Sequence, residues 1–247
     1  MLAQTLSDPT WWAAAAVIAL GCTVQTAMGF GLALVAAPLL VLWEPDWVPA
    51  VVTCAALMLS LLNTARLRRS VEWRMMLLPM LTRIPGTVLG AWLLLRLDRA
   101  ALQLLVAAMV LAGVAVSAIG RAFPATPLRL GLAGLASGFT GTTTSIGGPP
   151  MALVLQHGAA ETIRANLSFY FVYSCALSLT SYRLIGRFDD ALVVAGLLQL
   201  PAVAAGFVFG RRIRHWTDGR FRPLLLGLCS ASALAAVIGA LAGHGAG

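Results

Sequence analysis

The sequence is poor in charge and contains no lysine at all. Charged residues make up 11% of its 247 residues and acidic residues number only 9, while 60% of the residues are hydrophobic. So many apolar side chains exceed what the core of a soluble protein of this length can bury, which excludes an ordinary soluble domain. The mean hydropathy of +0.88 predicts a multi-pass membrane protein instead.

Cysteine is also scarce, and its spacing excludes a metal centre. Cys22, Cys54, Cys175 and Cys229 lie far apart, each within an apolar run, with no Cys-x-x-Cys or Cys/His pattern. The net charge of +8 comes from arginines in short clusters between apolar runs, the pattern of cytoplasmic loops. A nucleic-acid partner is therefore not expected, nor is a metal.

Six apolar runs are long enough to cross the roughly 30 Å of hydrocarbon in a bilayer. They cover residues 48–65, 75–95, 100–119, 167–184, 191–210 and 224–241. Two further apolar regions, residues 11–43 and 128–156, are too long for one span and too short for two. Small flexible residues interrupt both, at residues 29–31 and 138–150. These regions predict broken or re-entrant helical hairpins in an all-α membrane protein.

The two halves of the chain resemble each other in the order of their segments. Each has a break, a span, a proline-containing span and a span, which is typical of an internal repeat. We therefore predict one membrane domain, residues 1–247, with repeat 1 at residues 11–120 and repeat 2 at residues 128–242. The aligned positions are Pro38 with Pro150, Gly29 with Gly141, Arg83-Ile84-Pro85 with Gln199-Leu200-Pro201, and Gly90 with Gly206.

The arginines indicate how the chain threads the membrane, since cytoplasmic loops collect them. If region 128–156 crosses once, the loop arginines divide evenly between the two faces. If it enters and leaves on one face, twelve fall on one side and only Arg96, Arg99, Arg183 and Arg187 on the other. That arrangement gives each half one hairpin and three crossings, an odd number, and so predicts an inverted repeat. The arginines leave the first hairpin open.

Arg83 lies in the middle of the predicted span 75–95, where an ion without a partner costs upward of about 2.5 kcal/mol. No acidic residue lies deep in any predicted span, so a counter-ion within the protein is scarce. A guanidinium suits sulfonate, carboxylate or phosphate oxygens, so one interpretation is a bound anion and the other a structural bond to a carbonyl. Gln199 matches Arg83 in the second half and is either an anion donor or a helix–helix contact.

The two breaks contain the other candidate binding residues. A helix beginning at Pro149 and Pro150 would direct backbone N–H groups and the positive end of its dipole at an anion. The first break is shorter, with Gln25 as its polar neighbour. The alternative at both breaks is a kink that serves packing alone. The candidates are Gly141, Thr142, Thr143, Thr144, Ser145, Gly147 and Gly148 in the second break, and Gly29 and Gly31 in the first.

A polar face follows the second break. Asn166, Tyr170, Tyr173 and Ser174 recur at helical spacings of three and four, which fits either the lining of a cavity or hydrogen bonding between helices. Ser145 and His157 are the nearest approach to a nucleophile and a base, but no third group orients them. An intramembrane enzyme is therefore an alternative that the sequence supports weakly, and no catalytic residue is predicted.

A glycine-rich broken segment followed by proline in each half carries a resemblance to a known family. Gly29-Phe30-Gly31 with Pro38, and Gly138-Phe139-Thr140-Gly141 with Gly147-Gly148-Pro149-Pro150, resemble the TauE/SafE sulfite exporters, which are bacterial membrane permeases. The resemblance extends over about residues 14–241 and implies transport of sulfite, sulfonates or related organosulfur anions across the inner membrane. Three threonines, at residues 142–144, replace a stretch that is richer in glycine in many relatives. The particular anion stays open.

We therefore expect a secondary transporter that moves a small anion by alternating access. Its expected partners are the substrate and the lipid bilayer, with a proton or sodium as the coupling ion and a homodimer as a further option. The sequence contains no ATP-binding motif, and no cofactor is expected. A flippase for a phosphate-bearing lipid carrier and a passive anion channel are the alternatives.

Overall fold

The computed structural model describes residues 9–118, 124–156, 158–214 and 234. Within these residues the regular elements are all helices, so the predicted all-α fold is confirmed there. The α-helices are α2 (Pro9–Met28), α3 (Leu32–Trp43), α4 (Ala50–Leu67), α5 (Trp73–Leu94), α6 (Arg99–Ala118), α7 (Pro127–Thr144), α8 (Gly148–Leu155), α9 (Ala160–Leu184), α10 (Asp190–Leu198) and α11 (Leu200–Ile213). Two short 3₁₀ helices, η1 (Pro45–Trp47) and η2 (Arg68–Ser70), lie in connections.

Four segments are long and apolar enough to cross a membrane: Pro9–Met28, Ala50–Ser70, Trp73–Leu94 and Asp190–Ile213. The last three match the predicted spans 48–65, 75–95 and 191–210. Helix α6 covers the predicted span 100–119, and α9 begins well before the predicted span 167–184, at Ala160. The predicted span 224–241 lies outside the described residues apart from Leu234. The chain is thus a helical, multi-pass membrane protein.

Both broken regions fold as helical hairpins. Helix α3 turns back along α2, since a Cβ on Gly21 would lie 2.8 Å from the carbonyl oxygen of Leu32. Gly29 and Gly31, with φ angles of 94° and 126°, make this reversal in a conformation that other residues rarely adopt. Helix α8 turns back along α7 after Ser145, whose φ is 66°. The structure therefore has an interruption in each region. The second is shorter than the predicted break 138–150, because α7 continues to Thr144 and only residues 145–147 separate it from α8.

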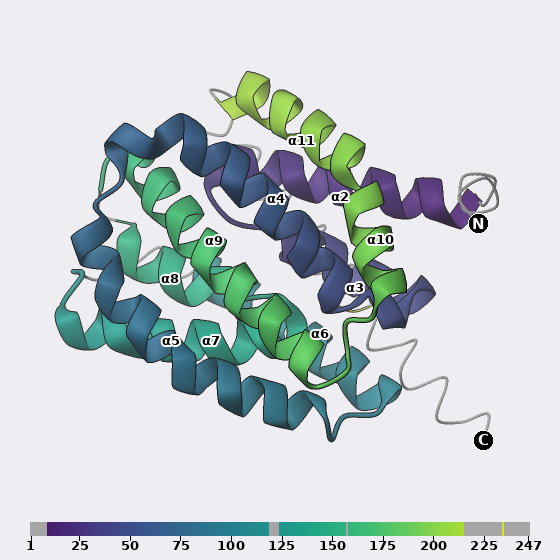
Figure 1. The fold of residues 1–247 in the computed structure, drawn as a ribbon. Coiled ribbons are helices and arrows are strands. Elements are labelled where there is room, and N and C mark those ends of the chain that lie inside the picture. The colour runs from purple at the N-terminus through teal and green to yellow at the C-terminus, as the bar shows by residue number, and fades with distance from the viewer. Residues whose placement is uncertain (1–8, 119–123, 157, 215–233, 235–247) are drawn as a thin grey trace.

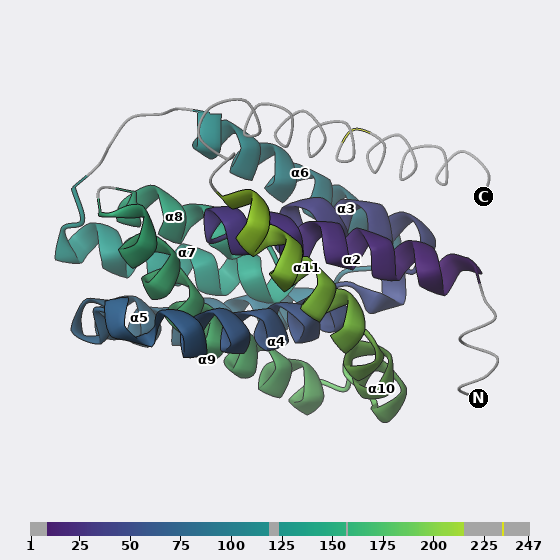
Figure 2. The same cartoon turned by 90° about the horizontal axis from the view of Figure 1, so that it is seen from above.

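Two pairs of parallel helices flank the molecule (Figure 1). Helix α2 packs against α11, and α5 packs against α7. Helices α4 and α9 pack against each other between these pairs. Helix α6 runs along α3 and α8 (Figure 2). The hairpin of each half of the chain thus lies beside the proline-containing helix of the other half.

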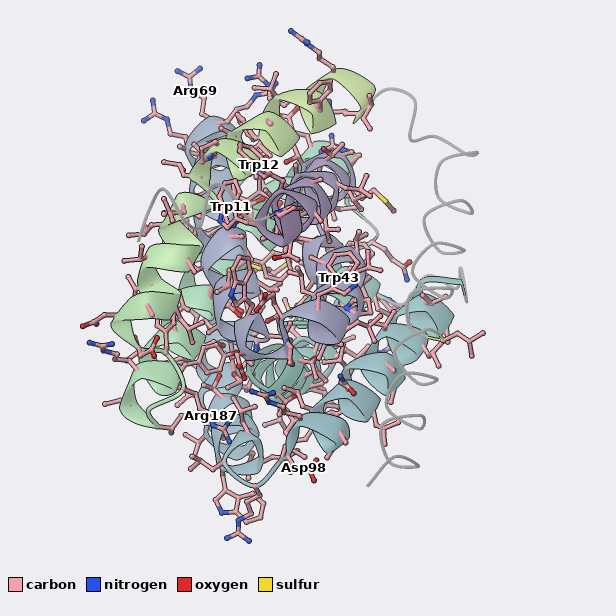
Figure 3. All side chains as sticks on the ribbon, turned by 90° about the vertical axis from the view of Figure 1, so that its right-hand side faces the viewer. Trp11, Trp12, Trp43, Arg69, Asp98 and Arg187 are labelled. Atoms are coloured by element: carbon pink, nitrogen blue, oxygen red, sulfur yellow. The ribbon has the colours of Figure 1, made fainter. Side chains whose placement is uncertain are left out.

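The charged connections gather at two ends of the molecule. Figure 3 shows Arg69 at one end and Arg187 with Asp98 at the other. The arginine-rich end also contains Arg66, Arg211, Arg212 and Arg214, which line one hollow. The C-terminal ends of α4 and α11 therefore lie together, as a second hairpin that enters and leaves on one face requires. We call the opposite end, with Asp98, Arg99 and Arg187, the arginine-poor end.

Glycines allow α5 and α7 to approach each other closely. A Cβ on Gly86 would collide with the carbonyl oxygen of Leu135, and a Cβ on Gly134 with that of Pro79. Small residues of this kind let the backbones of membrane helices touch. Gly138 in turn lies against the carbonyl oxygen of Arg83, so the close crossing brings this arginine directly beside α7.

This crossing predicts that two neighbouring glycines of α7 differ in how well they tolerate an added methyl group. We expect Gly134→Ala to lower the free energy of unfolding by about 1–3 kcal/mol, because its methyl group would collide with the backbone of α5. Gly131→Ala is the matched control, since a Cβ there meets only Thr82 Cγ2 at 3.5 Å. Unfolding of the detergent-solubilised protein followed by circular dichroism measures both. Equal stability of the two variants would contradict the close crossing.

Candidate functional site

A small cavity of about 40 Å³ lies where the tips of the two hairpins meet. The tips touch each other, since a Cβ on Gly148 at the start of α8 would lie 3.1 Å from the Cβ of Phe30. Residues at the starts of α3 and α8 line the cavity together with parts of α4, α5, α7 and α9. Both predicted breaks therefore contribute to one site.

Arg83 extends from α5 into the wall of this cavity and is only 1% exposed. Its Nη1 donates to the carbonyl oxygen of Ser137 at 2.7 Å and to the Ser137 hydroxyl at 3.0 Å. Its Nη2 donates to the Ser178 hydroxyl at 3.0 Å and to the carbonyl oxygen of Ser174 at 3.3 Å. The ring of Tyr170 lies 5.7 Å from the guanidinium carbon. Arg83 thereby joins α5 to α7 and α9.

The charge of Arg83 is solvated but not neutralised by these partners. All of its hydrogen-bond acceptors are uncharged, and its Nε has no partner among the described residues. None of the described residues that line the cavity is Asp or Glu. A buried cation with neutral partners leaves a positive potential in the cavity, which favours an anion there.

The first turns of two helices add to this positive potential. Gly31, Ala33 and Leu34 at the start of α3 line the cavity. The first N–H groups of a helix have no helical carbonyl as a partner, and here Gln25 Oε1 accepts from only one of them, the N–H of Leu32, at 3.3 Å. The positive end of the α3 dipole, together with N–H groups, therefore faces the cavity.

Helix α8 supplies fewer donors than the sequence analysis predicted. Gly148 at its first position has an N–H group, but Pro149 and Pro150 have none. The two prolines start the helix with a suitable φ and at the same time remove two of its orphan donors. The dipole of α8 still points toward the cavity, so this helix contributes by its field more than by hydrogen bonds.

The hydroxyl groups of the second break are used within the protein. Thr143 and Thr144 donate to the carbonyl oxygens of Phe139 and Thr140 at 2.9 and 2.8 Å. The Thr142 hydroxyl lies 3.0 Å from that of Ser178 and so supports a partner of Arg83. The three threonines therefore shape the end of α7 and do not line the cavity.

Ser145 fastens the tip of the second hairpin to α4. Its hydroxyl donates to the carbonyl oxygen of Pro49 at 2.7 Å and lies 3.0 Å from the hydroxyl of Thr53. Thr53 in turn donates to the Pro49 carbonyl at 2.8 Å. We call these three residues the Ser145 latch. A second cavity of about 340 Å³, at the arginine-poor end, begins on the other side of Pro49.

The structure brings half of the predicted binding residues to the cavity and leaves the other half outside its lining. Asn166 ties α9 to the start of α5, since its Oδ1 accepts from the N–H of Glu72 at 2.7 Å. Gln199 is fully buried at the junction of α10 and α11, with no partner for its amide among the described residues. His157 lies outside the described residues. The lining includes Gln25, Gly31, Arg83, Gly141, Ser145, Gly147 and Gly148, and excludes Gly29, Thr142, Thr143, Thr144, Asn166, Tyr170 and Gln199.

Two partners of Arg83 escaped the sequence analysis. Ser178 lies one turn beyond Ser174 and so continues the polar face of α9, a signal that could have identified it. Ser137 lies one turn before Gly141 and carries no signal of its own. Its hydroxyl also donates to the carbonyl oxygen of Gly147 at 2.7 Å, which holds the turn of the second hairpin beside Arg83.

The fold and site define a helical membrane protein with a basic cavity between two hairpin tips. The model of the sulfite exporter TauE/SafE family matches residues 13–247, and the chain belongs to this family. Its members are transporters, so the protein is a membrane transporter and not an enzyme. No curated protein and no solved structure matches the chain.

The geometry around Arg83 predicts that a lysine cannot replace it. One ammonium group cannot reach Ser137 on α7 and Ser178 on α9 at the same time, because it lacks the planar fork of the guanidinium. We expect Arg83→Lys to lower the free energy of unfolding by about 2 kcal/mol or more, measured by denaturant titration in detergent. Arg74→Lys is the control, because Arg74 is exposed. A similar stability of both variants would contradict a bridging role for Arg83.

Proposed function

We propose that the chain moves a small oxyanion across the membrane and binds it in the cavity beside Arg83. The observation that carries this proposal is the convergence of one buried guanidinium and the starts of α3 and α8 on a cavity without a carboxylate. Half-helix N-termini that face a shared site are how several secondary transporters hold anionic groups. The free Nε of Arg83 and the N–H groups of α3 are the donors that we assign to the anion.

The size of the cavity favours sulfite over a larger organosulfur anion. A water molecule needs about 10–15 Å³ of such space, so a cavity of about 40 Å³ holds roughly three groups of that size. A sulfite ion, with one sulfur and three oxygens, suits this volume better than a sulfonate with an organic chain. The headgroup of a phosphate-bearing lipid carrier is larger still, which argues against the flippase alternative.

Helix packing supports an inverted repeat of residues 11–120 and 128–242. Gly206 and Gly210 of α11 meet Ala19 and Thr23 of α2, and Gly134 and Gly138 of α7 meet Pro79 and Arg83 of α5. Each proline-containing helix therefore runs parallel to the hairpin helix of the opposite half. Such an exchange of partners is what a pseudo-twofold axis through the cavity produces.

In a cycle of alternating access, the Ser145 latch would act as the gate between the cavity and one side of the membrane. The latch separates the cavity from the larger cavity at the arginine-poor end, since Ser145 and Thr53 line the first and Pro49 lines the second. By the positive-inside rule the arginine-poor end faces away from the cytoplasm. Opening of the latch would join the two cavities and release the anion outward, whereas a channel would need both sides open at once.

The coupling ion, the homodimer and the location in a bacterial inner membrane stay predictions. A proton that drives transport usually binds a membrane-embedded Asp, Glu or His side chain. The described residues that line the cavity contain none. We therefore propose that the gradient of the anion itself is sufficient, with a coupled cation as the alternative.

Transport by purified protein in liposomes tests the site. We expect uptake of labelled sulfite, and we expect Arg83→Gln to reduce it by roughly tenfold or more because the charged donor is lost. Arg74→Gln removes an exposed arginine outside the cavity and should transport normally. Taurine, a sulfonate that carries an organic chain, should compete poorly with sulfite. Full sulfite uptake by Arg83→Gln would overturn the proposed site, and strong competition by taurine would overturn the size argument.

The latch predicts how Ser145→Ala behaves. Loss of its hydroxyl bonds should open the cavity more often toward the arginine-poor end and raise the rate at which Cys175, which lines the cavity, reacts with a membrane-impermeant thiol reagent added on that side. Labelling of the Cys175 peptide is measured by mass spectrometry. Thr140→Ala is the control, because the hydroxyl of Thr140 donates to the Ala136 carbonyl oxygen of its own helix and does not join it to α4. No difference in rate between the two variants would mean that Ser145 is not a gate.

A further inference from the structure

A hollow at the arginine-rich end is not used by the proposed transport cycle. It has a volume of about 470 Å³ and is lined by Arg66 at the end of α4 and by Arg211, Arg212 and Arg214 at the end of α11, together with Val208. Four guanidinium groups from two helices thus share one open space. Such a cluster is costly, because like charges repel each other when no anion lies between them.

The described side chains around this hollow carry a net positive charge even when the nearby acidic residue, Glu161, is counted. Glu161 is close enough to Arg66 to interact with its charge, as are Arg211 and Arg214. The Glu161 carboxylate accepts a hydrogen bond from the Ser70 hydroxyl at 3.0 Å. Phe207 supports Arg211 from one side, with its ring 5.5 Å from the guanidinium carbon. Among the described residues around the hollow, one carboxylate therefore stands against Arg66, Arg211 and Arg212, and this positive excess attracts an anion.

The surface beside the hollow is apolar. The span that contains α11 is buried over only 22% of its length, the least of the four candidate spans. Val208 and Phe209, within one turn of Arg211 and Arg212, are 44% and 57% exposed. The arginines thus lie at the end of a candidate membrane span whose exposed side chains are apolar, and the ends of such spans are where phospholipid phosphates meet water.

We infer that this hollow binds the phosphate groups of an anionic phospholipid, whose acyl chains lie along the exposed face of α11. Guanidinium groups bind phosphate oxygens in pairs, and basic pockets at the cytoplasmic ends of membrane helices are suited to lipids with one or two phosphates. Val208 and Phe209 distinguish this ligand from free phosphate, which has no apolar part. The inference is independent of the transport proposal, because it concerns different residues at one end of the molecule.

Lipid binding to the full-length protein in detergent tests the inference. Fluorescent cardiolipin is titrated against the wild type, against Arg66→Gln/Arg211→Gln/Arg212→Gln, and against Arg68→Gln/Arg69→Gln/Arg74→Gln. Both triple variants lose three charges at the same end, but only the first removes residues that line the hollow. We expect the dissociation constant to rise by roughly tenfold or more in the first variant and by less than about threefold in the second.

Competition experiments distinguish a phospholipid from free phosphate as the ligand of the hollow. Phosphatidylglycerol should displace the probe, whereas phosphatidylcholine and inorganic phosphate should not at matched phosphate concentration. Equal weakening in both triple variants would show general charge attraction and overturn the inference, as would equal competition by inorganic phosphate or by phosphatidylcholine. The single variant Arg212→Gln, at an exposed position, should weaken binding in part, which guards against a loss of binding caused by misfolding of the triple variant.

Discussion

The buried guanidinium of Arg83 is the constraint on which the rest of the site depends. An arginine that is 1% exposed needs acceptors for most of its donors, and in this protein they come from Ser137 on α7 and from Ser174 and Ser178 on α9. Those helices must therefore lie within reach of α5. The glycines at the α5–α7 crossing satisfy this requirement, because they let the two backbones touch, and the Ser137 carbonyl then lies 2.7 Å from Nη1.

Neutral acceptors suit a transporter better than a carboxylate would. A salt bridge to Asp or Glu would neutralise the guanidinium permanently and remove its attraction for a substrate anion. Carbonyl and hydroxyl oxygens stabilise the cation and leave its field in place. The dipoles of α3 and α8 strengthen that field with fixed backbone groups, which need no rearrangement when an anion enters. Binding is then electrostatic and limited in strength, as release on the other side requires.

Much of this architecture can be predicted from the sequence, because it follows from local chemistry. Glycine and proline mark both hairpin tips, and a lone arginine in an apolar run marks the candidate site. The partners of Arg83 cannot be predicted in this way, since Ser137 and Ser178 lie 54 and 95 positions away and depend on how helices cross. The small number of N–H donors at the start of α8 could have been predicted from the sequence, because Pro149 and Pro150 have no N–H group. The sequence likeness of the two halves also does not predict the surroundings of Gln199, whose amide has no partner among the described residues and lies outside the cavity lining, unlike Arg83.

The two sides of the cavity differ in chemistry, and this difference bears on how the transporter moves. Toward the arginine-poor end, the Ser145 latch consists of hydroxyl bonds to α4, each with a net contribution of about 0.5–1.5 kcal/mol. Elsewhere the two hairpin tips meet through an apolar contact, in which the Phe30 side chain lies against Gly148. Breaking a few hydroxyl bonds leaves groups that water can satisfy, whereas separating Phe30 from Gly148 exposes apolar surface. In the transport cycle that we propose, the latch is therefore the easier side to open, and an anion bound at Arg83 would leave by that side first.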